Sequence, residues 1–376
     1  MIDDLAQLTP NLEALGWDDE LEQWSAETRS EIEDPLSERG RIARVSRGFS
    51  LVFTGGDAVL AASGSMRTDG QLAPATGDYV LVTDDPEDGP SVAAIAPRRS
   101  ALTRRAAGRI PEAQVLAANI DDVFVMQGLD LDINLRRIER QLVVSWESGA
   151  EPVVVLTKAD QVDDPAAAVA EVSAIAPGVT VIAVSTVDGQ GLEAIAQRVG
   201  GGRTVALLGL SGIGKSTLVN ELTDGVVQRT GEVRAADRRG RHTTVTRDLI
   251  PIPSGGFIID TPGIREIGLW QAYEGMAKTF PEIASEVTEC RFADCEHVNE
   301  PDCAVRAAQA KGLILDRRLE HWRDLSAELE LQESQLEEFA RRSESRDRAD
   351  AERKRDSERP NSRSRRKPSK RGKRKR

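Results

Sequence analysis

Residues 203–222, RTVALLGLSGIGKSTLVNEL, place a glycine-rich turn between an apolar run and a run of helix-forming residues. The turn fits the pattern G-x-x-x-x-G-K-S, which binds phosphates when it follows a strand and begins a helix. Backbone N–H groups of such a turn hold the phosphates, Lys215 reaches the β- and γ-phosphates, and Ser216 binds Mg²⁺. A glycine-rich turn without a ligand is the alternative, and it leaves the lysine and the serine unexplained. The predicted phosphate-binding residues are Gly209, Leu210, Ser211, Gly212, Ile213, Gly214, Lys215, Ser216 and Thr217, and Lys215 is also predicted to be catalytic.

The stretch VVVLTKAD, residues 153–160, predicts that the base of the nucleotide is guanine. GTPases read guanine with an Asn-Lys-x-Asp loop, whose Asp accepts two hydrogen bonds that adenine cannot donate, and a buried unpaired acceptor costs about 1–3 kcal/mol. Here Thr157 replaces the Asn, and its hydroxyl can supply part of the bridge that the amide makes to neighbouring loops. A Lys-x-Asp on any exposed loop is the alternative, but a second loop starts at Ser185 after another strand of the same predicted sheet. The predicted guanine-binding residues are Thr157, Lys158, Ala159, Asp160 and Ser185.

The motif IIDTPG, residues 258–263, ends a further apolar run and predicts the metal side of the site. Asp260 is the expected Mg²⁺-side carboxylate, and the N–H of Gly263 is expected to meet the γ-phosphate. The basic, hydroxyl-rich residues 231–249 before it are typical of a switch loop that orders around Mg²⁺. Either Thr243 or Thr244 is the second metal ligand, and the pattern does not choose between them. The predicted magnesium residues are Ser216, Thr243, Thr244 and Asp260.

Ile264 follows this motif where many GTPases carry a glutamine that orients the attacking water. An alkyl chain cannot orient water, so a polar group from elsewhere must. His242, beside the switch threonines, is the predicted catalytic residue, and an exposed loop histidine is the alternative. A slow basal rate that a partner accelerates follows from this substitution.

All three cysteines of the chain lie in residues 290–303, CRFADCEHVNEPDC. With one histidine they form a Cys₃His set, which is a regular structural zinc site with no open position for catalysis. Three free cysteines are the alternative. The predicted zinc ligands are Cys290, Cys295, His297 and Cys303. The remaining histidine, His321, falls on a long charged helix and is expected to be solvated.

The domain organisation follows from changes in pattern along the chain. Five short runs of strand-forming residues between turn residues predict an all-β OB-fold barrel. Strands that then alternate with helices predict an α/β fold with a doubly wound parallel sheet. The expected parts are an acidic N-terminal extension (1–37), the OB-fold barrel (38–102), a P-loop GTPase domain (103–269), a helical zinc-binding domain (270–342) and a disordered basic tail (343–376).

The net charge of −12 conceals an uneven distribution. From Arg341 to Arg376 there are 18 Lys and Arg against six Asp and Glu, whereas the rest holds 32 basic against 56 acidic residues. Such a tail can neutralise several phosphates of RNA, and a solubilising tail is the alternative. Residues 1–34 are acidic and contain no apolar run, so neither a signal peptide nor a membrane span is expected. The protein is expected to be soluble and cytoplasmic.

The order of the GTPase motifs along this chain is a rotation of the usual order: TKAD and VSTVDG come first, followed by GLSGIGKST, RHTT and DTPG. This rotation predicts a circularly permuted domain. A barrel, this permuted domain and a Cys-x4-Cys-x-His-x5-Cys module together resemble the RsgA family, also called YjeQ or EngC. The resemblance covers about residues 38–340 and includes GRHTT at 240–244 and AANIDDVFV at 117–125.

The resemblance implies a GTPase that assists late maturation of the small ribosomal subunit, with hydrolysis of GTP to GDP and phosphate stimulated by that subunit. It also implies that the barrel and the zinc module grip ribosomal RNA, and it supports His242 as the catalytic residue. The expected cofactors are one structural Zn²⁺, and Mg²⁺ with GTP. No membrane partner is expected, and a monomer suits so large a target. Thr157 departs from the family pattern, and the family requires neither the acidic extension nor the basic tail.

Two alternatives to this function are considered, and the first comes from another functional class. A nucleotide-gated zinc-containing interaction protein, such as a metal-delivery chaperone, would use the cysteines as a transfer site, but transfer needs an exposed or incomplete ligand set. A different permuted GTPase acting on the large subunit is disfavoured by the barrel before the GTPase domain and the zinc module after it.

Overall fold

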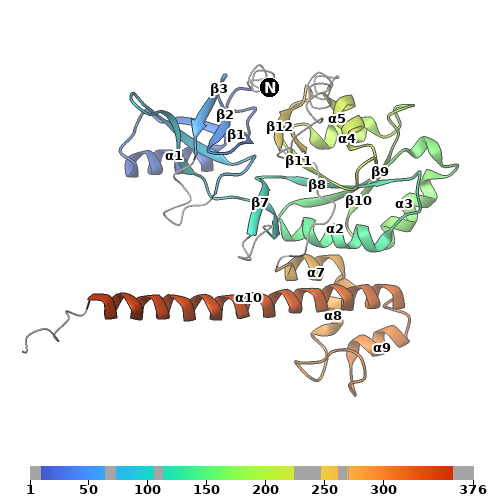
Figure 1. The fold of residues 1–376 in the computed structure, drawn as a ribbon. Coiled ribbons are helices and arrows are strands. Elements are labelled where there is room, and N and C mark those ends of the chain that lie inside the picture. The colour runs from blue at the N-terminus through green and yellow to red at the C-terminus, as the bar shows by residue number, and fades with distance from the viewer. Residues whose placement is uncertain are drawn as a thin grey trace, which may run out of the picture.

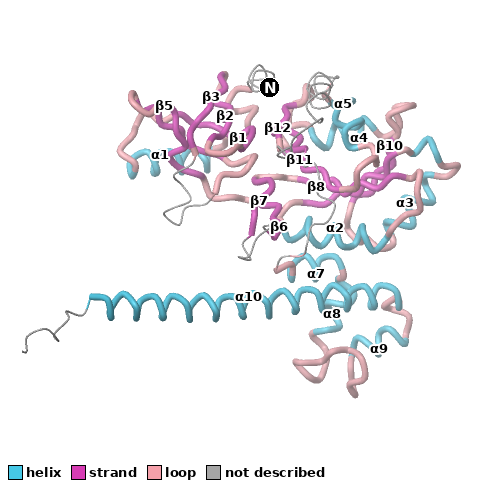
Figure 2. Tube along the Cα trace, viewed as in Figure 1, coloured by secondary structure: helices cyan, strands magenta, loops and turns pink. Residues whose placement is uncertain are grey.

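The computed structural model describes residues 10–63, 73–105, 113–223, 247–260, 269 and 271–358. Figure 1 shows three parts: a small barrel beside an α/β domain, and a helical C-terminal module below the α/β domain. Figure 2 separates them by element type, with strands in the first two parts and helices alone in the third. In the part of the chain that is described, no helix combines the length and the apolarity that crossing a bilayer requires.

The barrel has five strands, as the sequence predicts. They are β1 (Glu38–Val45), β2 (Phe49–Thr54), β3 (Asp57–Ala62), β4 (Tyr79–Asp85) and β5 (Gly89–Ile95). Their order is β1-β2-β3-β5-β4, and β4 pairs again with β1, which closes the barrel. The β3–β5 pair is parallel and the other pairs are antiparallel, so the arrangement is OB-like. Aliphatic side chains fill its interior: Ile42, Val52, Ala61, Val80, Val82 and Val92.

The described part of the N-terminal extension packs on this barrel. Helix α1 (Asp19–Glu31) begins at Asp18, whose side chain accepts a hydrogen bond from the N–H of Leu21. Trp17 meets Tyr79 of β4 edge-on, with ring centroids 5.8 Å apart. Leu15 is fully buried. The sequence predicts no contact for this segment, because Trp17 and Trp24 among acidic residues show no period that identifies a packing partner.

The α/β domain carries a six-stranded section of the main sheet in the order β10-β9-β8-β11-β13-β12. Its strands are β8 (Asp122–Gly128), β9 (Glu151–Thr157), β10 (Thr180–Val184), β11 (Thr204–Leu208), β12 (Asp248–Pro251) and β13 (Phe257–Asp260). All pairs are parallel except β12–β13. The chain runs outward from β8 to β10 and then returns to place β11 on the other side of β8. The carboxyl ends of β8 and β11 therefore border the crevice where α/β proteins bind ligands.

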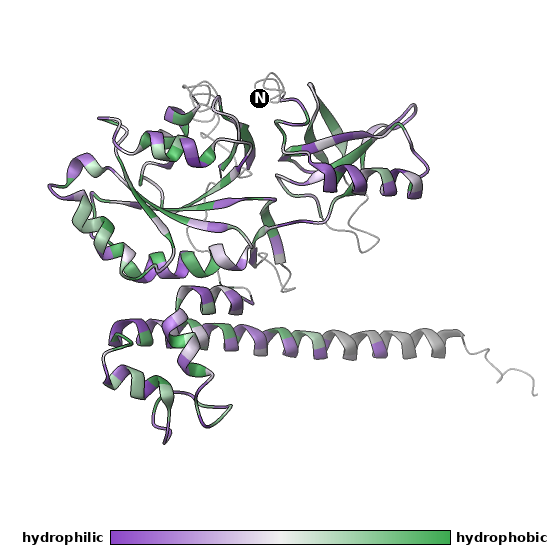
Figure 3. Ribbon diagram, turned by 180° about the vertical axis from the view of Figure 1, so that it is seen from behind, coloured by the Kyte–Doolittle hydropathy of each residue, from purple (hydrophilic) through white to green (hydrophobic). Residues whose placement is uncertain are grey.

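Among the described residues, four helices cover this sheet. They are α2 (Leu135–Glu147), α3 (Pro165–Ser173), α4 (Leu192–Val199) and α5 (Lys215–Leu222). Figure 3 shows the apolar strands in the middle of the domain and polar residues on the outer helix faces. A hairpin of β6 (Ala101–Arg105) and β7 (Ala113–Ala118) lies between the barrel and the domain. The boundary expected between residues 102 and 103 falls inside β6.

The barrel and the α/β domain share one continuous sheet, because β1 pairs with β12 at Arg44 and Asp248. Arg41 of β1 reinforces the joint and is only 1% exposed. Its guanidinium donates to four acceptors from three parts of the chain: the carbonyl oxygens of Leu15, Gly77 and Asn119, and the hydroxyl of Thr204. A single buried cation thus ties the extension, the barrel and the α/β domain together.

The C-terminal module contains α7 (Tyr273–Thr279), α8 (Pro281–Val287), α9 (Ala304–Ala310) and α10 (Asp316–Glu358). Helix α7 lies so close to α2 that a Cβ on Gly275 would sit 2.0 Å from the carbonyl oxygen of Val143. The disorder predicted beyond residue 343 is wrong as far as Glu358, because α10 continues to that residue. Opposite charges four residues apart favour such a helix, as in the Arg342–Glu338 ion pair and in the Glu344/Arg348 and Asp350/Lys354 spacings.

The prediction that His321 is solvated is also wrong. This residue is 6% exposed, and its Nδ1 lies 2.6 Å from Oε2 of Glu139 on α2. Glu139 is fully buried, and Nη1 of Arg318 donates to its other oxygen at 2.9 Å. The charge pattern of α10 suggested exposure on all sides, whereas one face of the helix is buried against α2 and α7.

Candidate functional site

The predicted phosphate loop connects β11 to α5 at the carboxyl edge of the sheet. Gly209 has φ = 150°, and a Cβ there would come within 2.8 Å of the carbonyl oxygen of Met126. Gly214 has φ = 100° and precedes the first turn of α5. These positions need glycine because other residues rarely adopt such angles and because β8 passes so close. The motif spacing is therefore a backbone requirement of this turn.

Lys215 lies within the loop that it is predicted to serve. Its Nζ donates to the carbonyl oxygens of Gly209 at 2.8 Å and Leu210 at 2.5 Å. Burial lowers the pKa of Lys215, and the nearby charge of Asp260 at the end of β13 opposes that shift. The ammonium group thus lies between the phosphate loop and the predicted metal-side carboxylate.

The predicted guanine loop follows β9 and contacts the phosphate loop directly. Thr157 is 5% exposed, and its hydroxyl donates to the carbonyl oxygen of Ile213. The hydroxyl bridge expected in place of the usual Asn is therefore present. Lys158 adopts a left-handed conformation with φ = 58°, after which the short 3₁₀ helix η2 (Ala159–Gln161) carries Asp160. The bridge fixes the base-reading segment against the phosphate-reading segment.

Asp130 belongs to this site and was missed by the sequence analysis. Its Oδ2 accepts from Nζ of Lys158 at 2.6 Å, and both side chains are 27% exposed. Asp130 follows β8, at the same edge of the sheet as the phosphate loop. The signal that could have identified it was a carboxylate two residues after a buried strand at the point where the strand order reverses.

One pocket brings the two predicted loops together. Its empty volume is about 470 Å³, which includes open solvent. Its lining residues are Thr157, Lys158, Asp160, Gln161, Val184, Thr186, Val187, Gly214, Thr217 and Leu218. They come from the segments after β9 and β10 and from the start of α5. A flat apolar base with polar edges fits this combination of aliphatic, hydroxyl and carboxylate groups.

Ser185, predicted to contact guanine, is fully buried and does not line the pocket. Its hydroxyl instead accepts from the backbone N–H groups of Val187 at 3.2 Å and Asp188 at 3.3 Å. Ser185 therefore shapes the turn that presents its neighbours Thr186 and Val187. The side chains of this loop that line the pocket are the next two, and the guanine contact predicted for Ser185 stays a prediction.

Four predicted residues lie outside the described residues: His242, Thr243, Thr244 and Gly263. Their predicted roles stay predictions. The described metal-side candidates are Ser216, on the first turn of α5, and Asp260, the last residue of β13.

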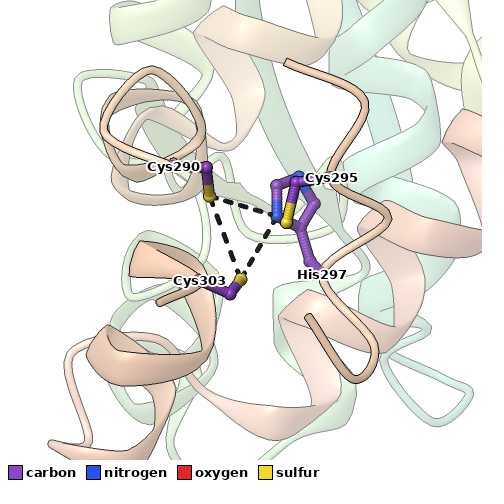
Figure 4. A group of neighbouring side chains, drawn as sticks. All are labelled: Cys290, Cys295, His297 and Cys303. Carbon is purple, nitrogen blue, oxygen red and sulfur yellow. Dashed lines mark hydrogen bonds between the residues drawn. The ribbon is translucent and has the colours of Figure 1, made fainter. Parts of the chain in front are cut away.

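The predicted Cys₃His set converges between α8 and α9, as Figure 4 shows. All four potential ligand atoms lie within 4.8 Å of one another. The Sγ atoms of Cys290 and Cys303 are 3.9 Å apart, and each lies 3.5 Å from Nδ1 of His297. Sulfur ligands at about 2.3 Å from a tetrahedral zinc ion would be about 3.8 Å apart. The distances among Cys290, Cys303 and His297 therefore match those expected around such an ion.

The surroundings of His297 suit a metal ligand. Burial lowers the pKa of His297, and the charge of Arg323 lowers it further, which favours the neutral imidazole that metals bind. Arg323 also donates to the carbonyl oxygen of His297, and the ring of Trp322 lies 5.5 Å from the imidazole. Both partners belong to α10, so this helix connects the cluster to the α2 contact.

Comparison with known proteins identifies the same architecture. The RsgA GTPase family model matches residues 95–270, and a second model, described as 50S ribosome-binding GTPase, matches residues 204–342. A protein of Methanosarcina acetivorans named small ribosomal subunit biogenesis GTPase RsgA is 41% identical over 86% of this chain and 86% of its own length. A protein of the same name from Streptomyces coelicolor is 45% identical over 84% of this chain and 86% of its own length.

Solved structures agree with the sequence matches. The crystal structure of YjeQ from Thermotoga maritima has a TM-score of 0.60 and 26% identity, covering 78% of this chain and 99% of that protein. The structure of YloQ, described as a circularly permuted GTPase, has a TM-score of 0.57 and 22% identity, covering 79% and 96%, and shares the fold. The expected permuted fold and the expected resemblance are both confirmed. The chain belongs to the RsgA GTPase family.

Proposed function

We propose that this chain hydrolyses GTP to GDP and phosphate in the pocket between β9, β10 and α5, and that it does so while bound to the small ribosomal subunit during its maturation. The observation that carries the proposal is the contact between the guanine loop and the phosphate loop, Thr157 to Ile213, beside that pocket. The names of the relatives, which specify small-subunit biogenesis, support the target.

Each residue of the site has a proposed role that follows from its chemistry. Asp160 would accept the two guanine hydrogen bonds, and the stem of Lys158 would lie along the base. Lys215 would neutralise charge on the β- and γ-phosphates, and backbone N–H groups of the loop would hold their oxygens. Ser216 and Asp260 would hold Mg²⁺, which would neutralise the charge that develops on the phosphates. Ala159 and Gly263 complete the set through backbone contacts.

His242 is the proposed residue that orients the attacking water, with Thr243 or Thr244 as the second metal ligand. The proposal rests on sequence alone, because Ile264 offers no polar group. Hydrolysis without the subunit is expected to be slow.

The Cys₃His cluster would hold one structural zinc ion. Four protein ligands leave no position for substrate, so the ion stabilises the loop between α8 and α9 rather than catalysing a reaction. The barrel, this loop and the basic residues 359–376, with eleven Lys and Arg and no acid, would contact ribosomal RNA. We propose a cytoplasmic monomer without a membrane partner.

The test is steady-state hydrolysis of GTP and ATP by the full chain, alone, with small subunits and with large subunits. Stimulation of GTP hydrolysis by small subunits alone is the expected result. Equal stimulation by large subunits would overturn the choice of target. Hydrolysis indifferent to both would favour an interaction protein whose nucleotide controls another partner.

Two variants serve as controls in the same assay. Lys215→Ala should abolish hydrolysis, and full activity would refute the phosphate-loop assignment. His242→Ala should bind GTP normally but lose stimulation, and retained stimulation would mean that another group positions the water.

A further inference from the structure

The acidic first turn of helix α1 covers two arginines at the barrel. Glu22 pairs with Arg39 of β1 at 2.5 Å. Asp18 and Glu20 both pair with Arg99, which follows β5, at 2.7 Å and 2.9 Å. The hydrogen bond from Arg39 lowers the pKa of Glu22, which keeps this carboxylate charged. Three carboxylates from the start of one helix therefore occupy the cations of both arginines.

These ion pairs are open to solvent. The side chains of Arg39 and Arg99 are 32% and 43% exposed, and those of the three carboxylates are between 47% and 83% exposed. Exposed pairs contribute little to stability, so they can separate while the chain stays folded. An arginine fork offers phosphate the same donors that it offers carboxylate. Phosphate groups of a ligand can therefore replace the carboxylates at both arginines.

Other contacts hold α1 in its place along the barrel (Figure 1). They form an apolar cluster of Leu21, Tyr79 and Ala96, against which Trp17 and Trp24 pack. Because this cluster does not involve the ion pairs, the helix can stay docked when the pairs open. Its carboxylates then remain close to any phosphate that replaces them, and like charges at such distances weaken binding.

We propose that Arg39 and Arg99 form a phosphate-binding surface for RNA, and that the first turn of α1 covers this surface and weakens the binding of RNA to the barrel. The proposal rests on the RNA contact that the proposed function gives to the barrel. It assigns a role to the acidic extension, which the family does not require. RNA that meets only the barrel has to displace the carboxylates, whereas RNA of the small subunit is also held by the other proposed contacts.

Neutralising the three carboxylates tests this surface. Asp18→Asn, Glu20→Gln and Glu22→Gln together keep hydrogen-bond acceptors, and Asn is as well suited as Asp to begin a helix. At about 0.1 M salt, the affinity of the full chain for a uridine oligonucleotide should rise roughly tenfold. The slope of log affinity against log salt should steepen by about 1–2, because two arginines gain phosphate contacts. Titration of a fluorescent oligonucleotide at several salt concentrations measures both changes.

A matched variant separates this surface from net charge. Glu27→Gln, Glu31→Gln and Glu33→Gln remove the same charge from exposed positions at the other end of α1, outside the ion pairs of Arg39 and Arg99. Charges farther apart than the screening length of about 10 Å interact weakly, so its affinity should stay within about twofold of the parent. Equal gains in the two triple variants would overturn the proposal, as would no gain in the first.

Removing the arginines shows where a gain arises. In the chain with the neutralised first turn, Arg39→Gln and Arg99→Gln should return the affinity to within about twofold of the parent. In the parent chain, the same two substitutions should change the affinity less, because carboxylates already cover both arginines. A gain that survives the loss of both arginines would place the RNA elsewhere and refute the proposal.

Two further comparisons keep the test decisive. Should Asp18→Asn disturb the start of α1, Glu20→Gln with Glu22→Gln leaves Asp18 in place and should still tighten RNA binding. If the parent chain does not bind small ribosomal subunits, the proposed function fails. If the parent binds them, but the first-turn variant and the matched variant bind the oligonucleotide alike, only this inference fails.

Discussion

The α/β domain is joined to the barrel and to the C-terminal module in two different ways. The barrel joins through strand pairing, with Arg41 buried and Arg44 half-buried at the joint. The C-terminal module joins through helix packing, with Glu139, Arg318 and His321 buried between α2 and α10. The first joint involves β12, next to the strand that carries Asp260. The second involves α2, which contributes no residue to the nucleotide pocket.

The two kinds of joint predict which property of the α/β domain each attached part can influence. A change at the barrel joint reaches the nucleotide through one strand pair, so it should alter nucleotide affinity. A change at the module joint alters a helix face that is remote from the pocket residues, so it should alter stability and leave affinity intact. Both joints contain buried charge, and that charge is costly to leave without a partner.

Removing the proposed zinc ion should have the largest effect, and the nucleotide site should stay intact. Structural zinc sites bind with about 10–16 kcal/mol in small peptides, so a strong chelator or Cys295→Ser should unfold the loop between α8 and α9. One equivalent of zinc should be released, as a metal-sensitive dye would report. Affinity for GDP should stay within twofold of the parent. A parallel loss of GDP affinity would show that the two joints are not independent.

Arg318→Met should come next in size. Arg318 donates to Glu139, Glu282, and the carbonyl oxygens of Ile175 and Thr279, and it is 3% exposed. Without Arg318, the buried Glu139 keeps His321 as a partner but loses a hydrogen-bonded cation. The free energy of unfolding should therefore fall by about 3–5 kcal/mol. Calorimetry of the variant measures this loss of stability.

Arg136→Gln is the matched control, because Arg136 of α2 also pairs with residues of α10. Arg136 pairs with the exposed Glu320 and Asp324 of α10 and is itself 45% exposed. Exposed pairs contribute about 0–1 kcal/mol, so this variant should be nearly neutral. Similar losses in the two variants would contradict the buried network.

Arg41→Met should destabilise the barrel joint by about 2–3 kcal/mol. The apolar stem is retained, but three carbonyl groups and the hydroxyl of Thr204 lose their donor. Hydrogen exchange should increase in α1 and β1 before it increases in α10. Unchanged protection of α1 would mean that the contact of Trp17 with Tyr79 suffices to hold the extension.

Asp130→Asn should have the smallest effect, and it should act on affinity rather than stability. Lys158 would lose an ion pair that is partly exposed, worth about 1 kcal/mol or less, so GTP affinity should fall no more than about fivefold. Binding measured with GTP and ATP shows whether guanine preference changes.

The sequence predicted the features that are encoded by residues close together along the chain. The phosphate loop, the guanine loop and the Cys₃His set have fixed spacings that a backbone or a metal imposes, and the barrel strands alternate with turn residues. The position of Thr157 even predicted the kind of bond it makes. What the sequence could not predict were partners distant along the chain.

Those partners share a physical reason for being missed. Arg318 and Glu139 are 179 residues apart, and Arg41 and Thr204 are 163 apart. Neither pair has a period or spacing to mark it. His321 was misjudged because a charged helix shows no sign in its own sequence of which face another helix will cover. The length of α10 was misjudged because the highly charged composition beyond residue 343 was given more weight than the four-residue spacing of opposite charges, which favours a helix.

The four acceptors of Arg41 also set an order of events during synthesis. The barrel strands leave the ribosome early, but one acceptor, Thr204, is made 163 residues after Arg41. At about 5–20 residues per second this delay is roughly 8–30 s. Over that interval the guanidinium must stay hydrated or use temporary partners, so the barrel cannot reach its final form as an autonomous unit. An N-terminal domain that is made first is therefore among the last to be completed.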